Sequence, residues 1–352
     1  MTRAKRVVMI FALLLVSLTF VWAGGQQEAA GPTGEAPSIP LPKGGHVEAV
    51  NQMPERELRI AFLTFQNNPF WFPVRDGAEA AKKYLANFNT KVDRIVMGDD
   101  LTADRVISAM EAAITKEYDA IAVVPIFDGT EIVINKAVDA GIVVSTYCAE
   151  GAKPSERLFF MGQQAYDAGQ QCGMEIEKFT GGTGKVAPIT GFFGAVQHEL
   201  RLNGGLDYLR DNCPGITLLE TLENRDKGEK AYEQTRDLLT AHSDIKAIYV
   251  TAGGPFGAAK AVQDLGLTGK VGVVCYDHIP ENIQYVRSGE VVGCIDQDPF
   301  GMGFDSCVIL HNYLITGKEP ELLNGKTTYE NRKLPVDCTM LTPENVDELY
   351  PE

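Results

Sequence analysis

The feature that most constrains this 352-residue chain is a repeated alternation of short apolar runs with longer amphipathic ones. The short runs are rich in valine and isoleucine and almost continuously apolar, which is typical of strands buried on both faces of a parallel sheet. We expect ten such strands, at residues 59–64, 94–97, 120–125, 142–147, 158–161, 185–190, 216–221, 247–251, 271–276 and 291–295.

The amphipathic runs between these strands carry apolar residues at helical spacing. Gly141, Gly266 and Gly289 follow three of them, where a left-handed helix cap is wanted. Repeated strand–helix units predict parallel sheets with right-handed crossovers. The expected helices are 75–85, 104–116, 130–140, 166–179, 200–212, 230–241, 256–265 and 281–288.

Ten strands would make an unusually long open sheet, and the pattern restarts at 181–191. We therefore expect an α/β fold with two similar doubly wound parallel-sheet lobes joined by a hinge. A ligand would bind in the cleft between them, at the carboxyl ends of the strands. The expected divisions are 1–23 as a signal peptide, 24–57 as a flexible tether, 58–162 with 298–325 as the N-terminal lobe, and 163–297 with 326–352 as the C-terminal lobe.

The chain begins like an export signal. Arg3, Lys5 and Arg6 precede an uncharged apolar run, 7–23, and small residues near Ala23 suit cleavage there. The alternative is a retained membrane anchor, because 17 residues is at the short edge of the roughly 17–25 needed to span a bilayer. Residues 24–57 are rich in Gly, Gln, Glu, Ala and Pro and lack an apolar period, which predicts the tether.

Charge and cysteine spacing exclude several function classes. The formal net charge is −15, and loss of the three N-terminal basic residues lowers it to about −18, which opposes binding to nucleic acid. None of the seven cysteines forms a CxxC pair, so zinc-ribbon and thioredoxin-like sites lack support. Several, such as Cys275 and Cys294, lie inside apolar runs and are expected to be small buried residues, although the sequence leaves their pairing open.

Enzyme motifs are incomplete in this chain. The stretch GGTGKV, 181–186, lacks the first glycine and the hydroxyl of a phosphate loop, and HELRL, 198–202, lacks the second histidine of a zinc-protease helix. No nucleophile is arranged with a base and its orienting partner. We expect no catalytic residue, no metal site and no cofactor.

Polar side chains instead follow one predicted strand after another. Each has a structural alternative: Asp277 could cap a helix, Arg201 could be a solvated helix residue, and Gln297 could satisfy a loop. Together they suit a ligand with many hydroxyls, because each hydroxyl both donates and accepts a hydrogen bond. The candidates are Thr64, Asn68, Arg201 with His198 and Glu199 close by, Asp226, Thr251, Asp277 and Gln297.

Several blocks in a fixed order resemble one family. NNPFW, AIAVVP, AGIVVSTY, VVCYDHIPENI and CIDQDPFGMG together resemble the type I periplasmic sugar-binding proteins of ABC transporters, in the ribose-binding group, over about 58–320. The resemblance implies that the asparagine and aromatic rings of NNPFW hold a sugar. It also implies ligand contacts for Thr64, Asp277, Gln297 and Arg201, with Glu199 as the alternative to Arg201. With Asp226 and Thr251 added from their strand-end positions, the expected ligand-binding set is Thr64, Asn68, Phe70, Trp71, Glu199, Arg201, Asp226, Thr251, Asp277 and Gln297.

The chain departs from the ribose binders at three places. Cys148-Ala149 stands where they carry an Asp-Arg pair, and Pro125 and Thr251 stand where they carry asparagines. These changes put ribose itself in doubt and leave another monosaccharide, a deoxy sugar or a cyclitol open.

The resemblance implies a monomeric periplasmic component of an ABC importer, which closes on a small neutral polyhydroxylated ligand and delivers it to a permease in the inner membrane. A chemoreceptor is a further candidate partner. The alternative ligand is a nucleoside or a furanone signal on the same scaffold. A sugar-binding repressor of the lactose-repressor group is disfavoured, because the N-terminus reads as an export segment and the charge opposes DNA.

Overall fold

The computed structural model describes residues 38–351, except 67, 152, 321–331 and 337. The predicted signal peptide and part of the predicted tether lie outside these residues. No helix in the described part is both long and apolar enough to cross a bilayer.

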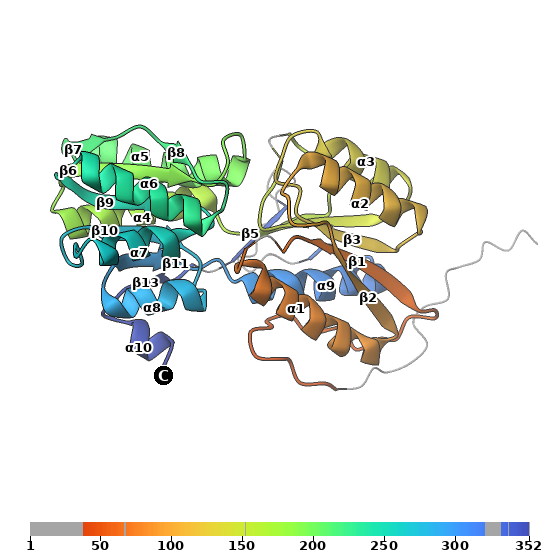
Figure 1. The fold of residues 1–352 in the computed structure, drawn as a ribbon. Coiled ribbons are helices and arrows are strands. Elements are labelled where there is room, and N and C mark those ends of the chain that lie inside the picture. The colour runs from red at the N-terminus through yellow and green to blue at the C-terminus, as the bar shows by residue number, and fades with distance from the viewer. Residues whose placement is uncertain (1–37, 67, 152, 321–331, 337, 352) are drawn as a thin grey trace, which may run out of the picture. The chain divides into compact units, whose positions relative to one another are not determined.

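The first lobe is built on a six-stranded sheet with the order β12-β5-β4-β3-β1-β2, in which all neighbouring strands are parallel (Figure 1). Its central strand is fully apolar over most of its length, so helices must cover both faces. Its strands are β1 (Leu58–Thr64), β2 (Thr90–Val96), β3 (Ala120–Val123), β4 (Val143–Tyr147), β5 (Phe159–Gly162) and β12 (Lys333–Pro335).

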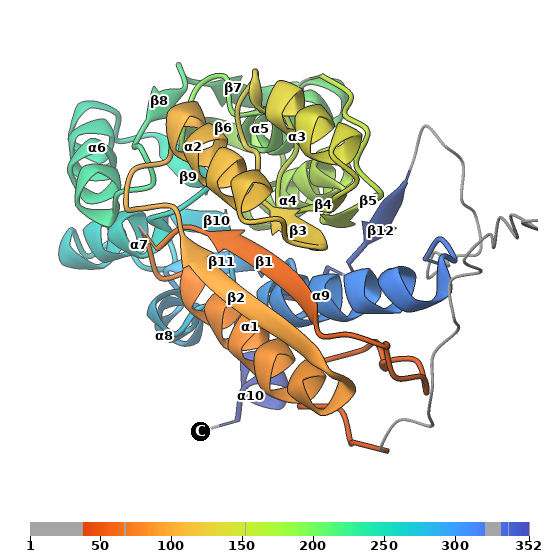
Figure 2. The same ribbon diagram turned by 90° about the vertical axis from the view of Figure 1, so that its right-hand side faces the viewer.

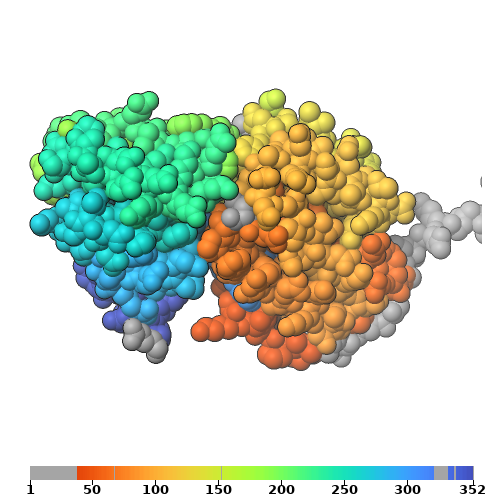
Figure 3. All heavy atoms as spheres, viewed as in Figure 1, coloured from red at the N-terminus to blue at the C-terminus, as the bar shows by residue number. Residues whose placement is uncertain are grey.

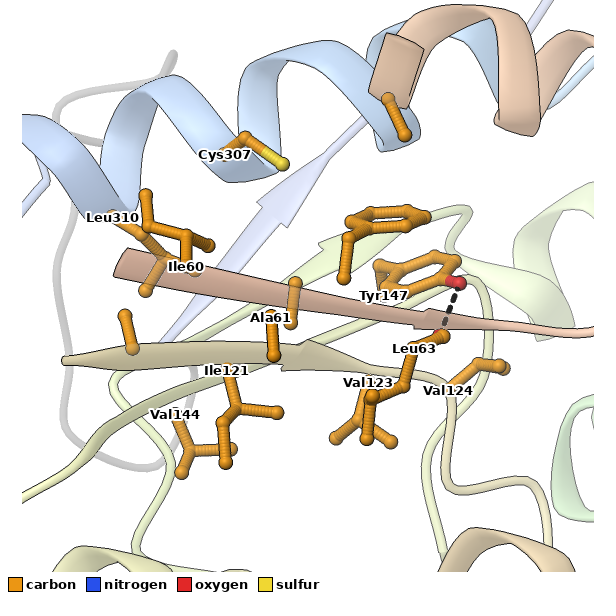
Figure 4. Close-up of a cluster of buried hydrophobic side chains, with 14 of the residues drawn as sticks. Ile60, Ala61, Leu63, Ile121, Val123, Val124, Val144, Tyr147, Cys307 and Leu310 are labelled. Carbon is orange, nitrogen blue, oxygen red and sulfur yellow. Dashed lines mark hydrogen bonds between the residues drawn. The ribbon is translucent and has the colours of Figure 1, made fainter. Parts of the chain in front are cut away.

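Figure 2 shows α1 and α9 on one face of this sheet and α2 and α3 on the other. In the close-up of the core, Cys307 and Leu310 of α9 lie over Ile60 of β1, and the Tyr147 hydroxyl donates to the Leu63 carbonyl at 2.8 Å (Figure 4). The helices are α1 (Trp71–Leu85), α2 (Ala103–Thr115), α3 (Thr130–Asp139) and α9 (Pro299–Thr316), with a short 3₁₀ turn, η1 (Ala86–Phe88).

The second lobe is built on another sheet, with the order β13-β11-β10-β9-β6-β7 and β8 beside β6. Its pairings are parallel, except that β13 runs antiparallel to β11. Its strands are β6 (Thr183–Thr190), β7 (Gly215–Leu218), β8 (Leu222–Glu223), β9 (Ile245–Val250), β10 (Gly272–Tyr276), β11 (Val291–Ile295) and β13 (Met340–Leu341).

Helices cover both faces of the second sheet as well. One apolar cluster joins the sheet to α4 and α5, and another joins it to α6, α7 and α8. The bounds are α4 (Ala165–Thr180), α5 (Val196–Asn212), α6 (Gly228–Ala241), α7 (Pro255–Asp264), α8 (Pro280–Ser288) and α10 (Val346–Leu349). In the space-filling view the α10 atoms lie with those of the second lobe (Figure 3).

The predicted fold class is confirmed: each lobe is a doubly wound parallel-sheet unit, and each of the ten predicted strands overlaps an observed one. The chain crosses between the lobes three times, after β5, after β11 and after β12. The third crossing differs from the expected division, because β12 pairs with β5 in the first sheet, whereas 326–352 was assigned wholly to the second lobe.

Residues 38–57, expected to be part of a flexible tether, instead contact the first lobe. Both oxygens of the buried Asp305 on α9 accept bonds from this segment: Oδ1 from the amides of His46 and Val47, and Oδ2 from the His46 ring, all at 2.9 Å. The Val50 amide donates to Asn312, about two turns beyond Asp305 on α9. This contact could not be predicted from the sequence, because hydrogen bonds between specific residues leave no repeating apolar pattern.

Cys148, Cys172, Cys213, Cys275, Cys294 and Cys307 are free thiols in this structure. Cys172, Cys213, Cys275, Cys294 and Cys307 are buried, as the apolar runs around Cys275 and Cys294 predicted.

Candidate functional site

A small pocket lies where the carboxyl ends of strands from both lobes meet, as expected for this class of fold. Its volume is only about 40 Å³ in this structure, so a ligand larger than a few waters enters only if the lobes or the lining side chains move. Seven of the ten predicted ligand-binding residues line it: Asn68, Phe70, Trp71, Arg201, Asp226, Asp277 and Gln297.

The other three predicted residues do not line this pocket. The Thr64 hydroxyl donates to the Phe65 carbonyl, and the Thr251 hydroxyl donates to that of Thr190, so both serve the cores of their own lobes. Glu199 is exposed and accepts from the Gly194 amide. Thr251 still reaches the site through its backbone, since its carbonyl accepts from Arg201.

The asparagine–aromatic block places its side chains at the start of α1. Asn68 Oδ1 accepts from the Phe70 amide at 3.0 Å, which leaves the amide nitrogen of Asn68 as its remaining donor group. Phe70 and Trp71 are 6% and 4% exposed and meet at 5.0 Å between ring centroids in an edge-to-face arrangement. Both rings therefore belong to the first core and to the pocket wall at the same time, whereas Phe72 points outward and is 46% exposed.

Arg201 is the central charge of the pocket. It is 3% exposed and donates to Gln163 Oε1 at 3.0 Å and to Gln297 Oε1 at 2.7 Å, while its guanidinium lies 4.3 Å from the centroid of the Tyr276 ring. Gln297 extends this network, because its side-chain nitrogen donates a hydrogen bond to Asp277. A buried cation surrounded by neutral acceptors and a ring is held in place and shielded from water.

Two carboxylates of the pocket are titratable near neutrality. Burial raises the pKa of Asp226 to about 6, against the opposing effects of the Gly253 amide and of Arg201. Burial likewise raises the pKa of Asp277 to about 6, with Arg201 and Gln297 acting in the opposite direction. Above pH 6 both groups accept hydrogen bonds only, which suits ligand hydroxyls that donate.

His198 lines the pocket as a neutral imidazole. Burial, together with the neighbouring Arg201 guanidinium, lowers the pKa of His198 to about 3. Its Nδ1 accepts from the Phe192 amide at 3.2 Å, so the proton is on Nε2. The sequence flagged this residue as half of an incomplete zinc motif and as a neighbour of Arg201.

Four pocket residues hold left-handed backbone angles although none is glycine. They end strands in both lobes: Ile126 after β3 (φ 54°), Cys148 after β4 (φ 64°), Asp226 after β8 (φ 56°) and Asp277 after β10 (φ 78°). For a β-branched residue such as Ile126 this conformation is a real outlier, and such strain concentrates at binding sites.

Sequence reasoning missed the rest of the lining. Gln197 lies in the first turn of α5, before the predicted start of that helix at residue 200. Leu101, Ile126, Ala149, Ala195, Ala252 and Gly253 carry no polar side chain that would mark them as candidates. Cys148 and Ala149 were noticed only as a departure from ribose binders.

One group of side chains in the described residues could in principle hold a metal ion, with ligand atoms within 4.8 Å of one another: His46, Asp298 and Asp305. It lies outside the pocket. Its carboxylates hold the N-terminal segment and the first turn of α9, since Asp298 Oδ1 accepts from the Gly301 amide. A cavity of about 780 Å³ borders this group and is lined mainly by α9, by the N-terminal segment and by residues around β12.

Comparison with known proteins places this architecture in a family. Residues 60–319 match the model of the periplasmic binding protein domain. The chain is 26% identical to the D-allose-binding periplasmic protein of Escherichia coli (strain K12) over 246 residues, which is 67% of this chain and 78% of that protein. It is 25% identical to the xylose/arabinose-binding protein XylF of Sulfolobus acidocaldarius over 286 residues, 75% of this chain and 68% of that protein.

Among solved structures, an ABC transporter solute binding protein from Burkholderia graminis C4D1M in complex with D-arabinose matches with a TM-score of 0.74 at 24% identity, over 86% of this chain and 99% of that one. This likeness shows the fold. The similarity to substrate-binding relatives agrees with the prediction that the chain is a binding protein and not an enzyme. Because the family model matches more than half of the chain, the chain belongs to the periplasmic binding protein family.

Proposed function

We propose that this protein is the periplasmic substrate-binding component of an ABC importer and binds a small neutral polyhydroxylated ligand, a monosaccharide or a cyclitol. The observation that carries the proposal is the meeting of Asn68, Arg201, Asp226, Asp277 and Gln297 with two aromatic rings in one pocket. Amides, carboxylates and a guanidinium supply both donors and acceptors to hydroxyls, and the rings supply flat apolar surface for C–H faces.

Ligand binding would proceed by closure of the lobes. The pocket takes residues from both lobes, so a ligand that bridges them favours the arrangement in which they are close. The closed form would then deliver the ligand to a permease in the inner membrane. A chemoreceptor that reads the same closed form is a second partner we propose.

The cellular part of the proposal rests on the N-terminal segment and on the family. Residues 1–23 have the charge and apolar run of an export signal, cleaved on the way to the periplasm or retained as an anchor. The relatives named above include a periplasmic protein of Escherichia coli. We propose that the exported chain acts as a monomer.

A thermal-shift screen of the chain without residues 1–23 tests the ligand class. A ligand that binds the folded state raises the melting temperature with its concentration relative to Kd. We expect monosaccharides or cyclitols to raise it and nucleosides to leave it unchanged. A rise with nucleosides alone would replace this proposal with the alternative, a nucleoside-binding protein on the same scaffold.

A further inference from the structure

The two lobes present walls of different chemistry to the pocket. The second lobe contributes charged and amide side chains, including Arg201, Asp226 and Asp277. The first lobe contributes rings, aliphatic groups and a thiol, including Leu101, Ile126 and Cys148. Among the described lining residues of the first lobe, Asn68 offers an amide and Trp71 offers only a single indole N–H donor.

Polar groups near the first-lobe wall are used inside that lobe. The Tyr147 hydroxyl, which is fully buried, donates to the Leu63 carbonyl at 2.8 Å (Figure 4). The Thr64 hydroxyl donates to the Phe65 carbonyl at 3.2 Å, and that of Thr146 donates to Glu150 at 3.3 Å. These side chains come from the ends of β1 and β4, where polar groups facing a ligand are expected, but their hydrogens are directed into the lobe.

The middle of this wall is formed by the turn after β4. Cys148 stands there with φ 64°, beside Ala149, and burial raises the pKa of its thiol to about 12, so it stays neutral. A neutral thiol and a methyl group offer only weak hydrogen bonding. A ligand hydroxyl placed against them would leave water without gaining a partner, which weakens binding by about tenfold or more.

We infer that the ligand presents its hydroxyls to the second lobe and an unsubstituted or methyl carbon to the wall formed by Ile126, Cys148 and Ala149, and is therefore a deoxy sugar. This inference rests on the proposed function, because it assumes that the pocket takes a sugar. It goes further by naming which part of the sugar lacks a hydroxyl and which residues select for that.

Calorimetric titration with matched sugars tests the inference. The pairs are D-fucose with D-galactose, L-rhamnose with L-mannose, 6-deoxy-D-glucose with D-glucose, and 2-deoxy-D-ribose with D-ribose. In at least one pair the deoxy member should bind about tenfold tighter or better. Equal or tighter binding of the hydroxylated member in every pair that binds overturns the inference and leaves the proposed function standing, whereas absence of binding by every monosaccharide and cyclitol overturns both.

A substitution at the wall sharpens this test. Cys148→Asn adds a donor and an acceptor at a left-handed position that asparagine tolerates. It should reduce the preference for the deoxy member by severalfold in favour of its hydroxylated partner, while the control Cys148→Ala keeps the preference. An unchanged preference in Cys148→Asn, with the melting temperature retained, would contradict the assignment of this wall.

A second inference concerns Gln163, which follows β5 at the first crossing between the lobes and is 1% exposed. Its side-chain nitrogen donates to the Asp296 carbonyl at 2.9 Å and to Cys338 Sγ at 3.4 Å. Asp296 follows β11 at the second crossing, and Cys338 lies between β12 and β13 at the third. One amide group therefore joins all three crossings.

The same residue is bonded to the pocket. Gln163 Oε1 accepts from Arg201 Nε at 3.0 Å, and its backbone carbonyl accepts from Gln197 Nε2 at 3.1 Å. Arg201 and Gln197 both line the pocket. A displacement of Arg201 by a ligand thus changes a bond to the residue that fixes the crossings.

We propose that Gln163 is a positioning residue that couples occupancy of the pocket to the angle between the lobes. The coupling needs both ends of the amide, because the oxygen serves Arg201 and the nitrogen serves the crossings. Gln163→Glu keeps an acceptor for Arg201 and loses the donor. Gln163→Met keeps the length of the side chain and loses both.

Small-angle X-ray scattering of the unliganded chain without residues 1–23 tests this role. Gln163→Met and Gln163→Glu should both shift the radius of gyration relative to the parent protein, because each releases the crossings. The control is Gln164→Ala, at the exposed neighbouring position, which should leave the scattering unchanged. Scattering of the Gln163 variants that superimposes on that of the parent protein, whatever their melting temperatures, would show a purely structural role and overturn the proposal.

Discussion

The two walls of the pocket differ in how their side chains are held. On the first-lobe wall, Phe70 and Trp71 are part of a core cluster that extends through α1 and α9. On the second-lobe wall, Arg201, Gln297 and Asp277 are held by hydrogen bonds to one another. The first wall therefore takes its position from apolar packing, and the second from a polar network. Substitutions on the first wall should therefore lower both stability and binding, whereas substitutions on the second wall should lower binding alone.

The largest effect is expected from Trp71→Ala on the first wall. Truncating a buried tryptophan in a packed core costs about 3–5 kcal/mol of unfolding free energy, and the lost ring surface should also weaken sugar binding. Denaturant unfolding and titration of the same sample measure both. The control is Phe72→Ala, one residue on and half-exposed, for which we expect a change within about 0.5 kcal/mol. Equal costs for the two variants would mean that Trp71 is not part of the core.

Asp277→Asn, on the second wall, should weaken ligand binding without lowering the stability of the unliganded protein. It removes a charged acceptor, whose hydrogen bond to a hydroxyl contributes about 1.5–3 kcal/mol, so affinity should fall roughly 10- to 150-fold. The unliganded protein at pH 7 should be as stable as before or more so, because burial raises the pKa of this carboxyl and ionising it is unfavourable. The exposed Asp237→Asn serves as a control for loss of charge. Retained affinity would remove Asp277 from the site.

The stability of the unliganded protein and its ligand affinity should both depend on pH, through the carboxyls of Asp226 and Asp277. The pKa values of Asp226 and Asp277, both raised to about 6, make the folded protein bind more protons than the unfolded chain between about pH 4 and 6. Stability of the unliganded protein from these groups therefore falls as pH rises through this range. Ligand affinity should do the reverse, decreasing by about tenfold from pH 7 to pH 5 as the acceptors are protonated.

Melting curves and titrations at pH 5, 6 and 7 compare the two trends directly. The Asp226→Asn/Asp277→Asn double variant should lose the decrease in stability that these two carboxyls cause between about pH 4 and 6. If affinity for the sugar found in the screen is flat across this range, the carboxylates do not accept bonds from it.

The smallest effect is expected for the contact between the N-terminal segment and α9, which lies outside the pocket. His46→Ala removes a ring bond to Asp305 and should cost about 0.5–1.5 kcal/mol of unfolding free energy. Sugar affinity should not change, because His46 lies outside the pocket. Lys43→Ala, at an exposed position three residues earlier, is the matched control. A change in affinity without a change in stability would show that the N-terminal segment acts on the pocket.

The sequence predicted the strands well because buried parallel strands carry a continuous apolar signal. It missed α9 for a related reason. Every residue from Gly301 to His311 is buried, so this helix shows no amphipathic stripe. It also missed β8, β12 and β13, which have only two or three residues each.

The residues of the site also fall into those that could be predicted from the sequence and those that could not. Polar residues directly after strands could be predicted from position, and seven of the ten candidates reach the pocket. Thr64 and Thr251 were expected to face a ligand because of the same position, but their hydroxyls are used inside their own lobes. Gln163 could not be found from local pattern, since its partners Asp296 and Cys338 are 133 and 175 residues away in the chain.

The contact between residues 38–50 and α9 has a practical consequence for protein engineering. The alternating pattern of the sequence suggests that a folded module begins at Leu58, and a fusion partner or reporter would naturally be joined there. Such a junction would remove the backbone donors that satisfy the buried carboxylate of Asp305 and would uncover Phe300 and Phe304, against which Gly44 and Gly45 pack. A biosensor built on this scaffold should therefore keep the chain from residue 38 onward and carry its N-terminal reporter before that point.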